Sequence, residues 1–199
     1  MLGSRLSRLI ALSLATLLPM SGKAADAVAD PAQTDASEAM FAAGRACYKG
    51  EGVPRDFAKA ADCFRHAAES GHVKAQAALG SMLLEGRGVD KDPVKASAWL
   101  RKAAGQGDAT AKLNLGWIAL EGIGTPADPK AGVDWYRQAA EAGQADAQLR
   151  LGDLYFWGKS GVERDLNEAV KWFEKAAAQG VASAQNTLGV MREIGRAHV

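Results

Sequence analysis

Histidine is the residue of this sequence best suited to bind a transition metal, and it is rare. The three histidines are His66, His72 and His198. None of them stands near a second ligand at a metal-binding spacing such as HExxH or a Cys–His cluster. We therefore expect neither a metal site nor a bound cofactor.

A hydrolase needs an activated nucleophile, and no serine of this sequence stands in a GxSxG or SxxK setting that would supply one. Glycine-rich turns such as GEGV and GRGV recur along the chain, which is typical of loops between repeats rather than of phosphate-binding sites. Pairs of acidic residues on predicted helices are interpreted as surface charge. The sequence therefore favours a protein without catalytic activity.

The elements that carry these residues follow an internal repeat. One glycine recurs at spacings of 36, 36, 36 and 37 residues, and an Ala-Ala pair, an aspartate and a second glycine keep the same period. The markers are Gly44, Gly80, Gly116, Gly152 and Gly189; Ala67-Ala68, Ala103-Ala104, Ala139-Ala140 and Ala176-Ala177; Asp56, Asp92, Asp128 and Asp165; and Gly71, Gly107, Gly143 and Gly180. The extra residue of the last spacing falls in the loop 158–161, where an insertion is tolerated. Four markers with one period identify a tandem-repeat protein.

Each repeat predicts two helices. The recurring aspartate suits the N-cap of the second helix, and Pro93 and Pro129 follow it at the first helical position. Glu168 stands three residues after Asp165, as in a capping box, and the second periodic glycine suits the left-handed position after a helix. The first helix has an apolar face of i, i+4, i+8 spacing. We therefore expect an all-α solenoid of antiparallel helix pairs over residues 37–192, with four complete repeats and a truncated fifth.

The glycine inside each first helix has a cost, because glycine destabilises a helix interior by about 1 kcal/mol relative to alanine. Its constant register argues against the alternative that these glycines are merely tolerated. The pattern predicts that the second helix of the pair approaches closely at this point. We expect the Ala-Ala pair of the second helix to lie against the glycine.

The N-terminus has the three-part pattern of a secretory signal peptide. Arg5 and Arg8 form a basic start, residues 9–20 form an apolar run, and small residues follow. The run is about a dozen residues long, whereas a membrane span needs roughly 20. We expect residues 1–24 to be a signal peptide and the mature protein to be periplasmic or secreted, without a membrane span; the alternative is an uncleaved anchor helix.

Two further segments are expected to lie outside the repeats. Residues 25–36 are rich in alanine, aspartate and small polar residues, which predicts a flexible leader. The last residues, 193–199, read EIGRAHV and match the translation of a common sequencing adapter, so we expect them to be a non-native tail and the complete protein to have more repeats. The alternative is a genuine terminus, since Gly195 stands six residues after Gly189 as the repeat requires.

The distribution of charge along the sequence does not favour nucleic acid as a partner. Removal of residues 1–24 takes away three of the 24 basic side chains and none of the 23 acidic ones, which leaves a net charge of −2. Nucleic-acid-binding proteins usually have a concentrated positive surface, whereas both signs are interspersed along this chain. We expect a protein or peptide partner instead.

The repeats resemble the Sel1-like repeat family, a relative of tetratricopeptide repeats. The resemblance is carried by segments such as LGSMLLEGRGVDKDPVKASAWLRKAAGQGDATA and LGDLYFWGKSGVERDLNEAVKWFEKAAAQGVASA, and it extends from residue 39 to about residue 192. It implies a right-handed superhelix that acts as a protein-interaction scaffold. Similar exported bacterial proteins have roles at the cell envelope, in host contact or in polysaccharide assembly.

Cys47 and Cys63 both lie in the first repeat, at the positions that Tyr155 and Trp172 occupy in the fourth. Residues at these two positions are expected to face each other across the helix pair. Two cysteines in place of two large packing residues, in an oxidising compartment, predict a disulfide. The alternative is two buried free thiols.

A candidate binding surface follows from the repeat. Three positions of the first helix, two residues before its glycine and one and five residues after it, should point away from the second helix, and in most repeat arrays that face lines the concave groove. The residues there are Arg45, Ser81, Trp117 and Asp153; Lys49, Glu85, Glu121 and Trp157; and Asn114 and Arg150. Tryptophan and arginine are favoured anchors of protein interfaces. We predict Asn114, Trp117, Arg150, Asp153 and Trp157 to bind the partner; the alternative is that both tryptophans pack on adjacent repeats.

These observations lead to two hypotheses about function. The first is an exported, non-catalytic scaffold that binds a peptide or protein on its concave face. The alternative is a hydrolase of cell-wall or penicillin metabolism, an activity ascribed to cysteine-rich relatives of the family. That alternative requires an activated serine or a metal, and the sequence shows the pattern of neither.

Overall fold

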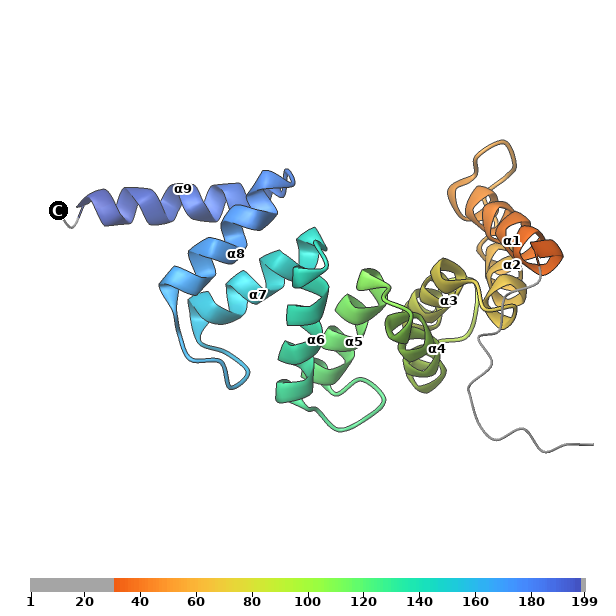
Figure 1. The fold of residues 1–199 in the computed structure, drawn as a ribbon, viewed down its shortest axis with the longest axis horizontal. Coiled ribbons are helices and arrows are strands. Elements are labelled where there is room, and N and C mark those ends of the chain that lie inside the picture. The colour runs from red at the N-terminus through yellow and green to blue at the C-terminus, as the bar shows by residue number, and fades with distance from the viewer. Residues whose placement is uncertain (1–30, 198–199) are drawn as a thin grey trace, which may run out of the picture.

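The computed structural model describes residues 31–197, with side chains over residues 36–193, and this part of the chain is all-helical. Its helices are α1 (Pro31–Lys49), α2 (Phe57–Glu69), α3 (Val73–Glu85), α4 (Pro93–Gly105), α5 (Ala109–Glu121), α6 (Pro129–Glu141), α7 (Ala145–Trp157), α8 (Leu166–Ala178) and α9 (Ala182–Ala197). They form consecutive antiparallel pairs, and the pairs stack side by side in chain order into an elongated, arched array (Figure 1). The predicted α-solenoid is confirmed.

The two predicted terminal segments differ partly from the structure. The predicted signal peptide, residues 1–24, lies outside the described residues. Helix α1 begins at Pro31, so residues 31–36 of the segment predicted as a leader are helical. A proline at the first helical position followed by alanine-rich sequence is compatible with a helix start, and composition alone did not reveal it. At the other end α9 continues to Ala197, through most of the predicted tail.

The recurring aspartates begin the second helices as predicted. Each one caps its helix, because its carboxylate accepts a hydrogen bond from the backbone N–H three residues later at 2.9–3.0 Å. The backbone N–H of the same aspartate donates to a carbonyl in the last turn of the preceding first helix, at 2.8–2.9 Å. One residue type therefore joins both helices of every pair.

The capping box predicted at Asp165 is only half formed. Asp165 accepts hydrogen bonds from the backbone N–H groups of Asn167 and Glu168. The Glu168 carboxylate does not complete the box, since it pairs with Lys171, and the Asp165 N–H donates to the carbonyl of Tyr155.

The glycines of the first helices mark close contacts between the paired helices. A Cβ atom added to Gly152 would lie 2.6 Å from the Phe173 ring, and one added to Gly80 would lie 2.6 Å from Leu100 Cγ. The predicted close approach is therefore confirmed, but the predicted partner was wrong. A bulky residue three positions before the Ala-Ala pair meets the glycine, in the sequence order Phe64, Leu100, Tyr136 and Phe173.

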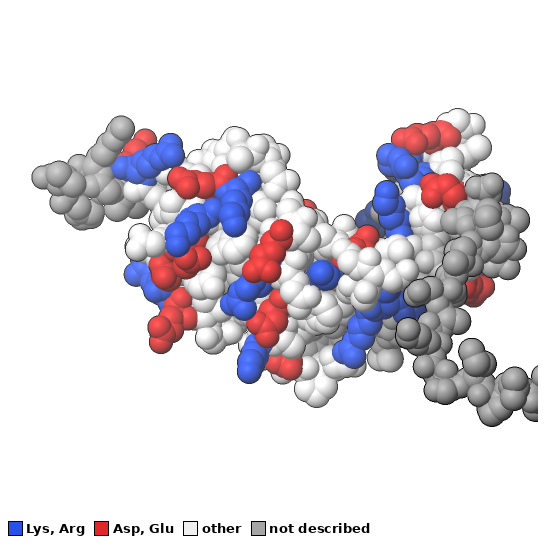
Figure 2. Space-filling view, in the orientation of Figure 1, with Lys and Arg blue, Asp and Glu red and all other residues white. Residues whose placement is uncertain are grey.

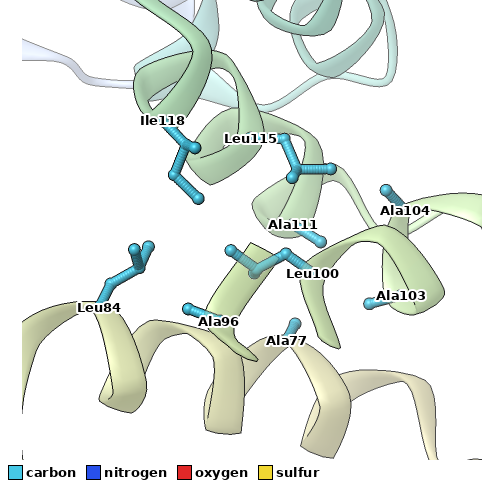
Figure 3. Close-up of a cluster of buried hydrophobic side chains, with 9 residues drawn as sticks. All are labelled: Ala77, Leu84, Ala96, Leu100, Ala103, Ala104, Ala111, Leu115 and Ile118. Carbon is cyan, nitrogen blue, oxygen red and sulfur yellow. The ribbon is translucent and has the colours of Figure 1, made fainter. Parts of the chain in front are cut away.

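The Ala-Ala pairs contribute instead to the packing of successive repeats. Ala103 and Ala104 of α4 lie in one buried cluster with Ala111 and Leu115 of α5. Figure 3 shows this cluster, with Leu100 between the side chains of α3 and those of α5. Small residues allow the next repeat to approach, so the core continues from one helix pair to the next. None of the described helices has the length and apolar character required to cross a membrane.

The glycine contact leads to a stability prediction. We expect Gly152→Ala to lower the free energy of unfolding by about 1–3 kcal/mol, because the new methyl group would overlap the fully buried Phe173 ring. Gly189→Ala is the matched control, since a Cβ there meets nothing within 4 Å and alanine favours the helix by about 0.5–1 kcal/mol. Urea unfolding of both variants measures the difference. Equal stability of the two variants would contradict the account.

Candidate binding groove

Two parallel rows of side chains come from the first helices of the third and fourth repeats. On α5 the row is Asn114, Trp117 and Glu121, and on α7 the row is Arg150, Asp153 and Trp157. Residues with spacings of three, four and seven lie on one face of a helix, so each row is continuous. The two rows line a single open groove of ≈ 740 Å³, together with side chains of α6 and of the loop after α7. The structure thus brings all five predicted binding residues together.

The groove also contains residues that the repeat analysis did not single out. They are Leu113, Leu120, Tyr136, Asp146, Leu154, Lys159 and Ser160. Lys159 and Ser160 belong to the loop with the inserted residue, and Ser160 is the one non-glycine residue of the described chain with a positive φ, 56°. The insertion therefore does more than lengthen a tolerant loop, because its side chains form an edge of the groove.

Hydrogen bonds between repeats hold the two sides of the groove in place. Asn114 donates from Nδ2 to Ser81 Oγ of α3 at 2.8 Å, which ties α5 to the preceding first helix. The buried Gln148 of α7 donates to the carbonyl of Ala140 on α6 at 3.1 Å and accepts from Gln179 after α8 at 2.8 Å. Helix α7 is therefore linked to both of its neighbours by one side chain.

Both groove tryptophans lie at the surface rather than in the core between repeats. Trp117 is 44% exposed and Trp157 is 61% exposed, whereas Trp172 of the second helix α8 is only 8% exposed. The Trp157 ring contacts Phe156 edge-on, with 4.7 Å between ring centroids. Large apolar side chains that remain exposed within one groove indicate an interaction surface.

The charged side chains of the groove form no ion pair with any side chain that the structure describes. Neighbours with i, i+3 spacing elsewhere in the described chain do pair, for example Asp62 with Arg65 at 2.8 Å and Asp134 with Arg137 at 3.0 Å. Arg150 and Asp153 have the same spacing, yet no ion pair of the described residues includes them or the other charged residues of the groove. The other charged residues are Glu121, Asp146 and Lys159. These groups are available to a ligand.

Two groups in the groove have shifted pKa values. Burial raises the pKa of Asp153, and the positive charges of Arg150 and Lys159 offset part of this rise. Burial likewise raises the pKa of Tyr136, with Arg150 lowering it and Glu121 raising it further. These charges act on one another because they face the same partly desolvated space.

An equivalent groove in the first two repeats has different chemistry. It has a volume of ≈ 170 Å³ and is lined by residues of α1, α2 and α3. Arg45 and Lys49 stand there at the positions of Trp117 and Glu121, and Ser81 and Glu85 at those of Asp153 and Trp157. The repeat therefore creates a hollow at equivalent positions more than once. The first hollow contains the aromatic side chains Tyr48 and Phe64, whereas the groove between α5 and α7 contains two tryptophans. Figure 2 shows basic and acidic side chains interspersed over the visible face.

The candidate residues outside the groove have structural surroundings. His72 caps α3 by accepting from the Ala75 N–H at 3.1 Å, contacts Glu38 at 2.9 Å and stacks on Phe41, a role that the sequence analysis did not identify. His66 is exposed. Among the described residues, no group of three or more His, Cys, Asp or Glu side chains could hold a metal ion.

Cys47 and Cys63 are both half-buried free thiols in the structure, so the predicted disulfide is not formed there. Burial raises the pKa of the Cys63 thiol, and Cys47 and Asp62 raise it further. The two cysteines therefore share one environment between α1 and α2, and their pairing stays a prediction.

Comparison with known proteins agrees with the repeat analysis. Residues 37–72, 73–108, 109–144 and 145–181 each match the Sel1 repeat family model. A Sel1 repeat protein from Oxalobacter formigenes is 34% identical, with a TM-score of 0.76 over 84% of this chain and 68% of that chain. A protective antigen present in uropathogenic Escherichia coli strains, which displays an SLR fold, is 33% identical, with a TM-score of 0.74.

That alignment covers 80% of this chain but only 34% of the antigen, so the chain spans about a third of the antigen's length. The cysteine rich protein B of Helicobacter pylori has a TM-score of 0.50 at 22% identity, over 78% of this chain and 96% of that chain, which shows a common fold alone. No match was found among curated proteins. With four consecutive matches that cover most of its length, the chain belongs to the Sel1 repeat family.

Proposed function

We propose that this chain is an exported, non-catalytic scaffold that binds a protein or peptide in the groove between α5 and α7. The observation that carries the proposal is the presence in one groove of two exposed tryptophans and five charged side chains that form no ion pair within the described part of the chain. Tryptophan and arginine dominate the binding energy of protein interfaces. Sel1 repeat proteins as a family mediate protein interactions, which supports the same reading.

The contact between α3 and α5, beside the groove, supports a binding face on the inner side of the curved array. Helix α5 contacts α3 directly, and the hydrogen bond from Asn114 to Ser81 joins the same two helices. First helices that touch one another lie on the side where the repeats crowd together, because a curved stack is compressed on its inner side.

Export rests on the N-terminal pattern of the sequence. No feature of the groove favours the alternative of a cell-wall or penicillin hydrolase. Ser160 is the serine that lines the groove, and no histidine lines it with that serine.

The binding proposal is tested by separating affinity from stability. Trp117→Ala should weaken partner binding by about 30-fold, corresponding to about 2 kcal/mol, because it removes an interface anchor. The same change should alter the free energy of unfolding by no more than about 0.5 kcal/mol, since the indole is exposed. The partner is captured from an envelope extract, identified, and titrated by isothermal calorimetry, while urea unfolding measures stability.

Two controls frame that experiment. Trp172→Ala should cost about 3–5 kcal/mol of stability, because this tryptophan is buried. Val94→Ala removes an apolar side chain that is 62% exposed and lies outside the groove, and it should leave both affinity and stability unchanged. A Trp117→Ala protein that melts like Trp172→Ala, or that binds the partner like wild type, would contradict the proposed function.

The export prediction has a direct measurement. Expression of the full-length gene with its N-terminus should give a mature protein that lacks about 24 to 27 residues, as expected for signal-peptide cleavage. Intact-mass spectrometry of the periplasmic and culture fractions detects this loss. A full-length protein confined to the cytoplasm would rule the prediction out.

The same exported protein tests the disulfide. Cys47 and Cys63 should resist alkylation until a reductant is added, because the oxidising compartment allows them to pair. The bond would close a loop of about 17 residues and stabilise the fold by about 3 kcal/mol in the chain-entropy model. Alkylation of both thiols in the unreduced exported protein would show that they are free.

A further inference from the structure

The groove has more carboxylates than cations, and burial makes the charged form of one of these carboxylates, Asp153, less favourable. Its carboxylates are Glu121, Asp146 and Asp153, against the two cations Arg150 and Lys159. Asp153 is half-buried and has no ion-pair partner among the described residues. A partly desolvated carboxylate without a partner is unfavourable, and a cation brought to it would relieve that cost.

An internal cation already lies near this place. Lys159 Nζ is 5.8 Å from the centre of the Trp157 ring and over its face, and the Lys159 charge also acts on Asp153. The two other lysine–tryptophan contacts of the described residues are closer: Lys102 lies 4.1 Å from the Trp99 ring and Lys175 lies 4.0 Å from the Trp172 ring. Those lysines are on the same helix as their tryptophan, whereas Lys159 follows the end of α7 in a glycine-containing loop. Its contact is therefore the looser one and the one that a ligand could displace.

We propose that the partner of this groove is a basic segment of a protein, which inserts a lysine or arginine side chain between Trp117 and Trp157 to pair with Asp153. The inference rests on the proposed function and gives the partner's chemistry. The indole faces attract a cation, the Asp153 carboxylate accepts a charge-assisted hydrogen bond from it, and Lys159 is the internal competitor that the ligand replaces.

The balance of charge favours this groove over its equivalent in the first two repeats as the site for a basic segment. The equivalent groove has two cations, Arg45 and Lys49, against one carboxylate, Glu85. This groove has three carboxylates against two cations. A positive side chain is therefore attracted more strongly to this groove, and the excess of positive charge in the other groove disfavours it there.

Three fluorescein-labelled heptapeptides test the inference. They share a leucine-containing sequence and differ only at the central residue, which is arginine, glutamine or glutamate, and fluorescence anisotropy gives each affinity. The arginine peptide should bind wild type at least about tenfold more tightly than the glutamine peptide, and the glutamate peptide should bind most weakly. Asp153→Asn, which keeps the side-chain shape, should weaken binding of the arginine peptide by about tenfold or more.

Lys159→Met should strengthen binding of the arginine peptide, whereas Asp153→Asn should weaken it. Because damage to the fold would weaken binding in both variants, this pair separates competition by Lys159 from such damage. Removal of the internal cation should tighten the arginine peptide by about two- to fivefold and leave the glutamine peptide unchanged. Asp62→Asn in the first repeat is the matched control for loss of a surface carboxylate and should have no effect. Melting temperatures confirm that each variant is folded before its affinity is interpreted.

The outcomes distinguish the inference from the function on which it rests. Three results would overturn the basic-segment inference. The arginine peptide does not bind, or the glutamate peptide binds as tightly as the arginine peptide or more tightly. The third result is an affinity for the arginine peptide that neither Asp153→Asn nor Lys159→Met changes. If Trp117→Ala still abolished capture of the natural partner, the binding function would stand without this partner chemistry. If Trp117→Ala had no effect either, both would fail.

Discussion

The close contact between a glycine of the first helix and a bulky side chain of the second is the constraint on which this array depends. Each glycine allows the side chain of a phenylalanine, leucine or tyrosine on the second helix to contact the backbone of the first helix directly. The resulting short distance between helices fixes which face of the first helix is inside the pair. The opposite face of the first helix is thereby turned outward in every repeat. This face contains the positions two residues before the glycine and one and five residues after it. The groove residues at these outward positions are therefore exposed or half-buried as a consequence of packing on the other side of their helices.

The function of the array then resides in what the outward positions carry. A solenoid is nearly one-dimensional, so a substitution at a surface position changes the local chemistry without disturbing distant repeats. The third and fourth repeats place tryptophans, unpaired charges and an inserted loop at one junction, while the first two place arginine and lysine at the equivalent hollow. Gln148 and its hydrogen bonds hold that junction together from the side away from solvent. A common scaffold thus presents different binding surfaces along its length.

The sequence predicted those parts of the structure that depend on local or periodic signals. An N-cap aspartate or a glycine after a helix acts on the residues beside it, and a fixed period places every outward position once one is known. The partner of Gly152 was predicted wrongly because Phe173 and the Ala-Ala pair both face inward on α8, and spacing alone does not say which of them meets the glycine. Tyr136 was missed because it is a buried residue of a second helix that reaches the groove, and Lys159 because loop geometry does not follow the period. The start of α1 at Pro31 was not predicted, because an alanine-rich sequence is compatible with a leader as well as with a helix.

Site-specific photo-crosslinking is the measurement that tests most directly whether binding takes place between α5 and α7. A photo-reactive amino acid replaces Glu121 in one protein and Glu85, its equivalent one repeat earlier, in another. Both sites lie at the end of a first helix and share the same repeat position, so only the local groove differs. The account predicts a crosslink to the natural partner from position 121 and little or none from position 85. Equal crosslinking from both positions, or crosslinking from position 85 alone, would contradict it.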